Sequence, residues 1–430
     1  MTVLGGNFRD TAGINASDLV LADATNRVWV SGAGSKIVLS SKGALQPGNF
    51  SVGAAYGRNS MLVEDGGEIV APSRFLVGAT ANANNNTAVF ANGAEGRMND
   101  VRVGEGGSVG NVLEFKSHAT GTVDNVIYVG GTEAASSGNS LVVSNAVFSC
   151  SRTAVSFEAG STSNAIYIVG SDTSFTTTVT SMPRYPFVDC GAYNTFEMDG
   201  AEWNYWLNMQ LDTAAASNTI RFVNGARMNM LGGLYSGTNH VASCGNRVYV
   251  GSGARMNMAF LHVSRCDNVF TVSNATVTAF GSGSENARGI RLGLQLTNVA
   301  ESNIGGNGLV LQGDTPKVSS EKDFRFYRDS FLRFELPDGG YAAGYVPIVA
   351  DSAILDKTTS LDVVWPNGGV DAGSYTLVST ANGIAVDDSV LVAANAVLRP
   401  QSGGVAKLVL RNEGRDLVLK VTTSLSIVIF

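Results

Sequence analysis

The stretch EWNYW, from Glu202 to Trp206, holds two of the four tryptophans of this 430-residue chain. Flat aromatic rings beside polar groups suit the faces of sugar rings or the surface of a protein partner. Trp203, Tyr205 and Trp206 are therefore candidate binding residues. We favour the other interpretation, packing, in which Trp206 fills a core while Trp203 and Tyr205 lie at a corner of the chain.

No arrangement of acids, histidines or nucleophiles identifies a reaction. A glycoside hydrolase needs two carboxylates about 5–10 Å apart, whereas the acids noted here are single, at Glu114 and Asp267, or span a corner, as do Asp199 and Glu202. No Cys/His spacing of a zinc site occurs. We therefore expect no catalytic residue, no metal and no cofactor. An enzyme remains the less favoured of two hypotheses.

The composition also limits the partners. The formal net charge is −7, charged residues make up 15 % of the chain, and lysines and arginines do not cluster, which argues against nucleic acid as a partner. No apolar run approaches the ~20 residues of a transmembrane helix. The start, MTVLGGNFRD, lacks the features of a secretory signal, so we expect either an intracellular chain or one whose leader was removed, and favour the second.

The elements that would position any site follow from a repeat. Each repeat begins with an asparagine. Apolar residues stand two and four places after it, and a small or polar residue stands six places after it. The leading asparagines are spaced 22 to 39 residues apart, at Asn26, Asn59, Asn86, Asn111, Asn139, Asn164, Asn194, Asn218, Asn246, Asn268 and Asn307. A recurring period of this length is typical of repeat architectures.

Alternation of apolar and mixed positions after each asparagine predicts a strand with one buried and one solvent-facing side. About two further short strands, such as RFLVG and DVRVG, follow in each repeat. Three strands per repeat and no helical spacing predict an all-β fold, a parallel β-helix of about 11 rungs. We take it to be right-handed, as such connections usually are.

The asparagine column has a physical explanation. Asparagine tolerates the left-handed backbone of a tight corner, and its amide can bond to the asparagine of the next rung, as in ladders of stacked strands. We predict a structural ladder; a ligand-binding row is the less favoured alternative.

The hexamer GARMNM occurs at residues 225–230 and again at 253–258, at the same distance from Asn218 and Asn246. The repetition therefore indicates packing: Met228 and Met230, like Met256 and Met258, should face the core. Arg227 and Arg255 should lie one above the other on the surface, where they are further candidate binding residues.

Two cysteines, Cys244 and Cys266, each precede a repeat asparagine by two residues. They should therefore share a column on adjacent rungs. Their separation suits a disulfide, but parallel Cβ directions disfavour closure. We favour a stack of buried thiols, with a disulfide as the alternative. Cys150 and Cys190 fall outside this column.

The repeat ends before the C-terminus. We expect a parallel β-helix over residues 1–316, a charged connecting segment over 317–336, and a β-rich C-terminal cap or small β domain over 337–430. The segment AKLVLRNEGRDLVLKVT predicts a hairpin around NEGRD. A cap is needed because an open terminal rung invites self-association through the solenoid ends.

The asparagine-led strands and the ending AGSYTLVSTANGI…LVLRNEGRDLVLKV resemble the passenger regions of bacterial autotransporter-type surface proteins. The resemblance implies a secreted, surface-displayed β-helix and carries over no functional residues. We therefore expect an extracellular or cell-surface protein with a structural or adhesive role, contacting glycans or surface proteins. The alternative is a polysaccharide lyase or glycoside hydrolase on the same scaffold.

Overall fold

The computed structural model describes residues 2–4, 7–9, 19–21, 24–39, 49–158, 160–178, 191–205, 208–211, 215–236, 243–264, 266–281, 289–293, 305–327, 329–400 and 404–422. The fold is all-β, with 56 % strand against 3 % helix, and its stacked parallel strands form a β-solenoid of about 11 turns. The predicted fold class is confirmed. The handedness stays a prediction.

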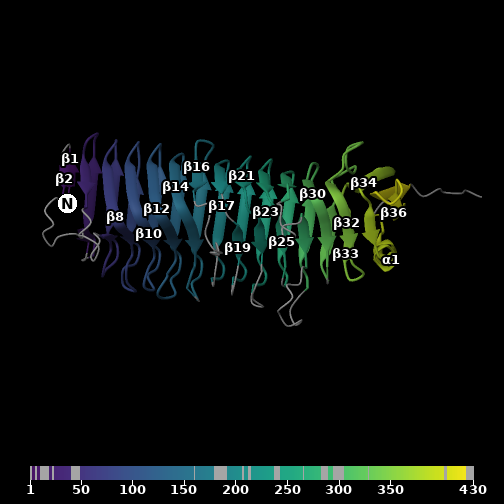
Figure 1. Ribbon diagram of the computed structural model, residues 1–430, viewed down its shortest axis with the longest axis horizontal. Helices are drawn as coiled ribbons and strands as arrows, with labels where there is room; N and C mark the ends of the chain where they lie inside the picture. The colour runs from purple at the N-terminus through teal and green to yellow at the C-terminus, as the bar shows by residue number, and fades with distance from the viewer. Residues whose placement is uncertain are drawn as a thin grey trace, which may run out of the picture. The chain divides into compact units, whose positions relative to one another are not determined.

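The chain divides into two compact units, residues 1–221 with 226–228 and residues 222–225 with 229–430. Each unit contributes strands to two sheets, called A and B (Figure 1). Strands β20 (Thr219–Val223) and β21 (Arg227–Met230) have residues in both units.

In the first unit, each repeat asparagine directly precedes a strand of sheet A. These strands are β4 (Arg27–Ser31), β7 (Ser60–Glu64), β9 (Thr87–Phe90), β11 (Val112–Lys116), β13 (Ser140–Ser144), β15 (Ala165–Val169) and β17 (Thr195–Asp199), followed by β20. Sheet A also contains β1 (Thr2–Leu4), which pairs with β4. They pair in parallel with no shift, as Leu113 with Leu141 and Ile166 with Phe196 show.

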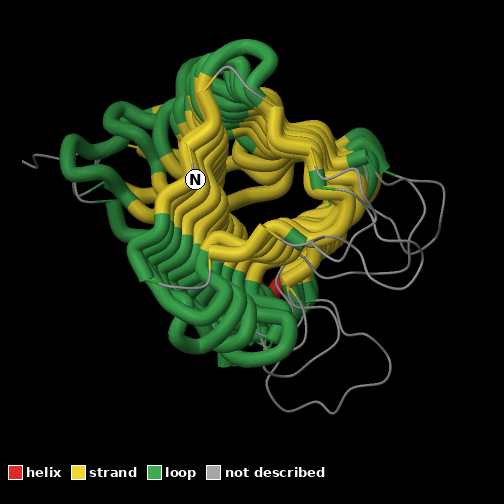
Figure 2. Tube along the Cα trace, turned by 90° about the vertical axis from the view of Figure 1, so that its left-hand side faces the viewer, coloured by secondary structure: helices red, strands yellow, loops and turns green. Residues whose placement is uncertain are grey.

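Sheet B of the first unit supplies the other sides of each rung. Its strands are β2 (Asn7–Arg9), β3 (Leu19–Leu21), β5 (Lys36–Val38), β6 (Phe50–Val52), β8 (Glu68–Val77), β10 (Glu95–Val103), β12 (Thr120–Val129), β14 (Val147–Val155), β16 (Ser174–Thr177), β18 (Glu202–Tyr205), β19 (Met209–Leu211) and β21. In the middle rungs, the two further strands predicted per repeat form one long strand, namely β8, β10 or β12. The pairing of these long strands shifts in register partway along their length. Figure 2 shows strands of this unit stacked behind one another, with loops at the corners.

The asparagine ladder is present. The Oδ1 atom of Asn139 accepts hydrogen bonds from both the backbone N–H (3.0 Å) and the side-chain Nδ2 (2.9 Å) of Asn111, and Asn111 accepts the same pair from Asn86. Equivalent contacts join Asn59 to Asn86 and Asn194 to Asn218, and the side chains are buried. One carbonyl thus satisfies two buried donors of the neighbouring rung, which fixes the register of the strands.

The explanation of asparagine by a left-handed backbone is wrong. The left-handed residue is the one immediately before each asparagine. All eleven such residues have positive φ: Thr25, Arg58, Asn85, Gly110, Gly138, Ser163, Tyr193, Ser217, Gly245, Asp267 and Gly306. Asparagine is therefore selected for its amide, while the corner itself is made by its neighbour.

A second column, mostly of glycine, leaves room for the ladder. A Cβ atom added to Gly78 would lie 2.3 Å from the Asn111 side chain, and one added to Gly104 would lie 2.1 Å from that of Asn139. Where Ser156 stands in this column, its hydroxyl donates to Asn194 Oδ1 (2.7 Å) and accepts from Asn164 Nδ2 (2.8 Å). The hydroxyl therefore inserts between two amides of the ladder.

Stacked aromatic rings fill the core of the first unit. Rings in contact run from Phe50 through Phe75, Phe90, Phe115, Phe148 and Phe175 to Trp203. Gly121 makes space for them, since a Cβ there would lie 2.4 Å from a ring carbon of Phe148. Ring stacking between rungs stabilises the same register as the ladder.

The second unit repeats this arrangement. Sheet A consists of β23 (Arg247–Gly251), β26 (Val269–Ser273), β29 (Gly308–Gln312), β31 (Phe331–Glu335) and β33 (Ser360–Val364). Sheet B consists of β22 (Leu234–Ser236), β24 (Arg255–Met258), β25 (Leu261–Val263), β27 (Thr276–Ala279), β28 (Ile290–Leu292), β30 (Lys317–Phe326), β32 (Ile348–Leu355), β34 (Gly373–Thr380), β35 (Ile384–Val386), β36 (Val405–Arg411) and β37 (Asp416–Thr422). Its ladder joins Asn246 to Asn268 and Asn268 to Asn307.

Residues 317–336, expected to connect two domains, instead continue the solenoid. Strand β30 pairs in parallel with β27 and β28, and β31 pairs with β29 and β33. Apart from Asp323, which is buried, their described charged residues are partly or fully exposed, while Val318, Phe324 and Phe326 are buried. The charge density misled because it lies on the outer side of ordinary strands.

The C-terminal hairpin is confirmed, as β36 and β37 pair antiparallel, but the helix α1 (Asp388–Val397) was not predicted. The side chain of Asp387 caps its start by accepting from the Ser389 N–H (2.9 Å). The helix contacts β33 and β36, and the Asn395 amide bonds to both the N–H (2.7 Å) and the carbonyl (3.1 Å) of Leu408. Asn395 thus bonds to backbone groups of β36 that an additional strand would otherwise bond. This opposes pairing of another chain along that edge of the sheet.

Replacing Asn139 by alanine should destabilise the fold by about 2–4 kcal/mol, because each buried polar group that loses its partner costs about 1–3 kcal/mol. Asn257→Ala is the matched control, since its amide bonds to Asn229 (3.1 Å) on the exposed side of the strand. Urea unfolding of both variants measures the difference. Equal destabilisation would contradict the ladder's role.

Candidate functional site

The predicted aromatic binding residues are not at the surface. Trp203 and Tyr205 are buried, and Trp203 packs against Phe175 and donates from Nε1 to Thr177 Oγ1 (3.1 Å). Trp206 lies outside the described residues. The prediction that Trp203 and Tyr205 face a ligand, or lie at a corner, is therefore wrong.

The error comes from the length of the turn after sheet A. Trp203 is buried and stands nine residues after Asn194. The buried Met228 stands ten residues after Asn218, so the turn before Trp203 is one residue shorter. A change of one residue in a turn exchanges inward and outward positions. Beyond the end of its own strand, counting from the asparagine is reliable only between rungs whose turns have the same length.

The methionine prediction is confirmed: Met228, Met230, Met256 and Met258 are all buried. Arg227 and Arg255 begin β21 and β24, and both are exposed, as a surface role requires. Binding of a partner by these two arginines stays a prediction.

Cys244 and Cys266 form a disulfide, with Cα atoms 4.8 Å apart. Both are half-buried. The favoured prediction of stacked buried thiols is therefore wrong, and the weighed alternative holds. Cys150 is a buried free thiol whose pKa is raised by burial, and Cys190 lies outside the described residues.

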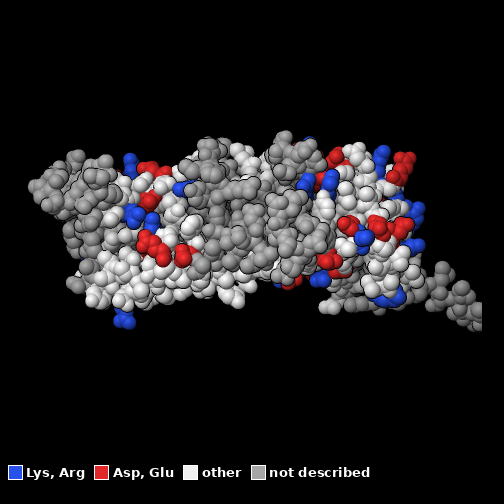
Figure 3. Space-filling model, turned by 60° about the horizontal axis from the view of Figure 1, so that its bottom comes forward, with Lys and Arg blue, Asp and Glu red and all other residues white. Residues whose placement is uncertain are grey.

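Carboxylates do stack, contrary to the sequence analysis. Glu68 and Glu95 are directly paired on neighbouring strands, and both stand nine places after a repeat asparagine, which was the available signal. Lys36 pairs with Glu68 (2.8 Å), and Arg97 contacts both Glu95 (3.1 Å) and Glu68 (3.9 Å). These acids are held by cations of the same chain. On the face in Figure 3, acidic and basic side chains lie interspersed in the same way.

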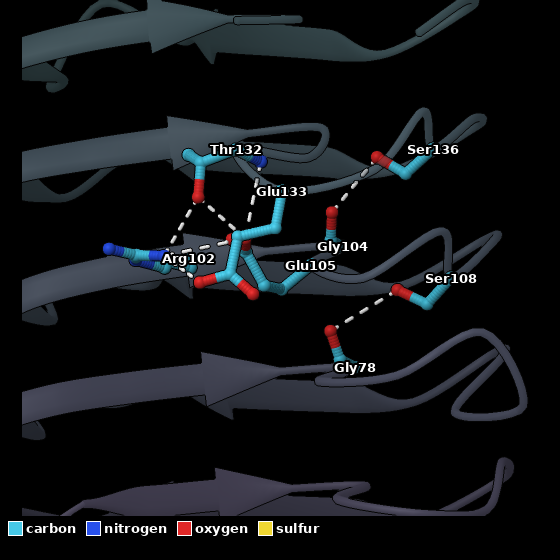
Figure 4. Close-up of polar contacts among 8 residues, drawn as sticks. All are labelled: Gly78, Arg102, Gly104, Glu105, Ser108, Thr132, Glu133 and Ser136. Carbon is cyan, nitrogen blue, oxygen red and sulfur yellow. Dashed lines mark hydrogen bonds and ion pairs between the residues drawn. The ribbon is translucent and has the colours of Figure 1, made fainter. Parts of the chain in front are cut away.

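A denser polar group joins two rungs of the first unit (Figure 4). This Arg102 cluster consists of Arg102, Glu105, Thr132 and Glu133. Glu105 Oε1 accepts from the Thr132 N–H (3.2 Å) and hydroxyl (2.5 Å) and lies 3.3 Å from Arg102 Nη1. That same nitrogen lies 4.0 Å from Glu133 Oε1 and donates to Thr132 Oγ1 (2.8 Å).

The two acids of the cluster differ in environment. The Glu105 side chain is 8 % exposed and that of Glu133 is 71 % exposed, yet both converge on one guanidinium. Arg102 also lies over the ring of Tyr128, which contacts Phe157. Paired acids beside aromatic rings can hydrogen-bond sugar hydroxyls, and two carboxylates are what hydrolysis requires. Sequence spacing missed them because Glu105 and Glu133 lie in turns of unequal length.

A column of short polar side chains follows the outer side of sheet B. In the first unit Thr122, Ser149, Thr176 and Asn204 are paired in register and are partly exposed. In the second unit Asn257, Thr278 and Ser319 are paired likewise, and the Ser319 hydroxyl donates to Thr278 Oγ1 (3.2 Å). Each unit therefore repeats hydrogen-bonding groups at the strand spacing of about 4.8 Å.

Among the described residues, no three or more His, Cys, Asp or Glu side chains are grouped to hold a metal ion. No helix in the same residues is long and apolar enough to span a membrane. Comparison with protein-family models, with curated proteins and with solved structures gives no match for this chain.

Glu105→Ala should destabilise the first unit by about 1–3 kcal/mol, because it leaves the largely buried Arg102 and Thr132 without their shared acceptor. Glu133→Ala should cost less than about 0.5 kcal/mol, as expected of an exposed ion pair. Denaturant unfolding compares the two. A larger loss of stability for Glu133→Ala than for Glu105→Ala would contradict the role of Glu105 as the main acceptor of the cluster.

The stability of the second unit should depend on pH through His262. Burial, and then the charge of Arg291, lowers the pKa of this imidazole to about 3, against about 6.5 in an unfolded chain. Below pH 6.5 the unfolded chain therefore binds a proton that the folded chain does not, and stability falls as pH falls, by at most about 1.4 kcal/mol per pH unit. Unfolding of His262→Gln at pH 7 and pH 5 should show a smaller loss than the parent protein. An equal loss would contradict this assignment.

Proposed function

We propose that this chain is a non-catalytic β-solenoid that is secreted or displayed at a bacterial cell surface, where it acts as a structural or adhesive element and contacts glycans or partner proteins. The observation that carries the proposal is the polar column on sheet B. Glycans are polymers of hydroxyl groups, and stacked Thr, Ser and Asn side chains offer them matching donors and acceptors at a regular spacing.

Two further features support this role. The Cys244–Cys266 disulfide is of a kind that persists in oxidising compartments such as the cell exterior. The buried ladder and the covering helix α1 suit a scaffold that holds its shape without a partner. The resemblance of the repeats to autotransporter passenger regions points to the same location.

The alternative, a carbohydrate-active enzyme, is favoured by the convergence of Glu105 and Glu133 on Arg102. Against it, Glu105 is bound by Thr132 and Arg102 and is almost covered. A general acid must reach the leaving-group oxygen of its substrate. We therefore assign the cluster a joining role between rungs.

A glycan array combined with a depolymerisation assay on the full chain tests the proposal. We expect binding to some of the immobilised glycans and no new reducing or unsaturated ends after prolonged incubation. Thr176→Val tests the column, because it removes one hydroxyl and keeps the side-chain shape; it should weaken binding several-fold, while Thr87→Val on sheet A should not. Release of new chain ends, abolished by Glu105→Gln, would establish the enzyme instead.

A further inference from the structure

Helix α1 of the second unit has an outward side made of apolar side chains. One side of the helix, with Val390 and Ala394, is buried, and the helix contacts β33 and β36. The exposed side, which we call the α1 face, consists of Val392, Ala393, Ala396 and Val397. A helix that is apolar all round is ordinarily buried, so the α1 face is a surface that a partner is expected to cover.

The exposure of this face is high for apolar side chains. Val397 is 72 % exposed and Val392 is 68 % exposed, more than any other large apolar side chain in the part of the chain that the structure describes. Single exposed apolar residues are common on protein surfaces, whereas adjacent ones mark sites of interaction. Val392 and Val397 belong to one short helix and are therefore adjacent.

The described chain ends close to this helix. The Asn395 amide holds α1 to Leu408 of β36, and Val405, three residues before Leu408, is paired with Thr422, the last residue of β37. Three residues of a strand span about 10 Å. The chain therefore leaves β37 about 10 Å, measured along β36, from the bonds that hold the helix.

The residues that follow Thr422 have the composition of an apolar partner. Residues 423–430 read TSLSIVIF, carry no charge and lie outside the described residues. Their β-branched side chains favour an extended backbone, in which Leu425, Ile427 and Ile429 would share one side. Eight extended residues span about 26 Å, whereas a helix of ten residues is about 15 Å long. The segment is thus long enough to run along the whole α1 face.

The size of the α1 face favours this segment over a second copy of the chain. A helix about 15 Å long and about 10 Å wide presents about 150 Å² in projection. A stable interface between two proteins buries about 800 Å² of each partner. A segment of the same chain loses much less translational and rotational freedom on binding, so that a smaller contact is enough to hold it.

We propose that residues 423–430 occupy the α1 face, with Leu425, Ile427 and Ile429 packed against Val392 and Val397. The segment thereby covers an apolar surface of the second unit with a part of the same chain. It also opposes the predicted self-association through the solenoid ends, which an uncovered apolar face would promote. This inference does not depend on contact with glycans.

Photo-cross-linking of the full chain tests the contact. Phe430→p-benzoylphenylalanine keeps an aromatic side chain at the end of the segment, and mass spectrometry identifies the peptide to which it becomes linked. We expect links within one chain to the peptide that carries α1. Val392→Asp should lower their yield by about fivefold or more, because a buried charge without a partner is costly. Val147→Asp, at an exposed valine of β14 in the first unit, is the control and should leave the yield unchanged.

A second pair of full-chain variants tests which side of the segment packs. Ile427→Asp should release the segment, raise the fluorescence of the dye ANS by about twofold or more, since ANS reports exposed apolar surface, and lower the melting temperature by a few degrees. Ser426→Asp adds the same charge on the opposite side of an extended segment. It should change neither measurement.

The contrary results are distinct. Absence of links to α1, or links that Val392→Asp does not reduce, would show that residues 423–430 do not occupy the α1 face. Links between two chains would make a second copy the occupant and overturn the proposal. Equal effects of Ile427→Asp and Ser426→Asp would overturn the proposed packing. None of these results bears on the glycan array, which tests the proposed function separately.

Discussion

The structure depends on one hydrogen-bonding arrangement, in which a buried asparagine carbonyl accepts two hydrogen bonds from the asparagine of the neighbouring rung. Three conditions must hold at once for it to form. The residue before the asparagine must adopt positive φ, a residue such as Gly104 must leave out its Cβ, and the strand that follows must stay in register. The sequence repeats because each rung must meet these three conditions. They explain why the asparagine is kept while the residues around it vary.

A fixed register turns residues that are distant in sequence into columns. Inward columns give the stacked phenylalanines, and outward columns give rows of hydroxyls, in-register carboxylates or adjacent arginines. Most outward charges meet an opposite charge of the same chain, as Glu197 meets Arg221 (2.9 Å). Arg291 stands between His262 and Arg325 in its column, and the carboxylate of Asp323 is engaged by Arg325.

Features whose position is fixed relative to the asparagine could be predicted from the sequence. Features whose position depends on the length of a turn could not. The strands after each asparagine, the ladder and the buried methionines were predictable, because two-residue alternation begins at a fixed point. The position of Trp203 was not, since the turn before β18 is one residue shorter than that before β21. The Arg102 cluster was hidden for the same reason. The stacked Glu68 and Glu95 could have been found by counting nine places from the asparagine, whereas α1 and Asn395 belong to no repeat and left no periodic signal.

Hydrogen exchange of the asparagine side chains, followed by NMR, tests the ladder most directly. The account predicts that the Nδ2 protons of Asn86, Asn111 and Asn139 exchange slowly, together with their backbone amides, because all are buried and bonded to the next rung. The exposed Asn257 amide should exchange rapidly. Exchange of the ladder side chains as fast as that of Asn257 would contradict the account.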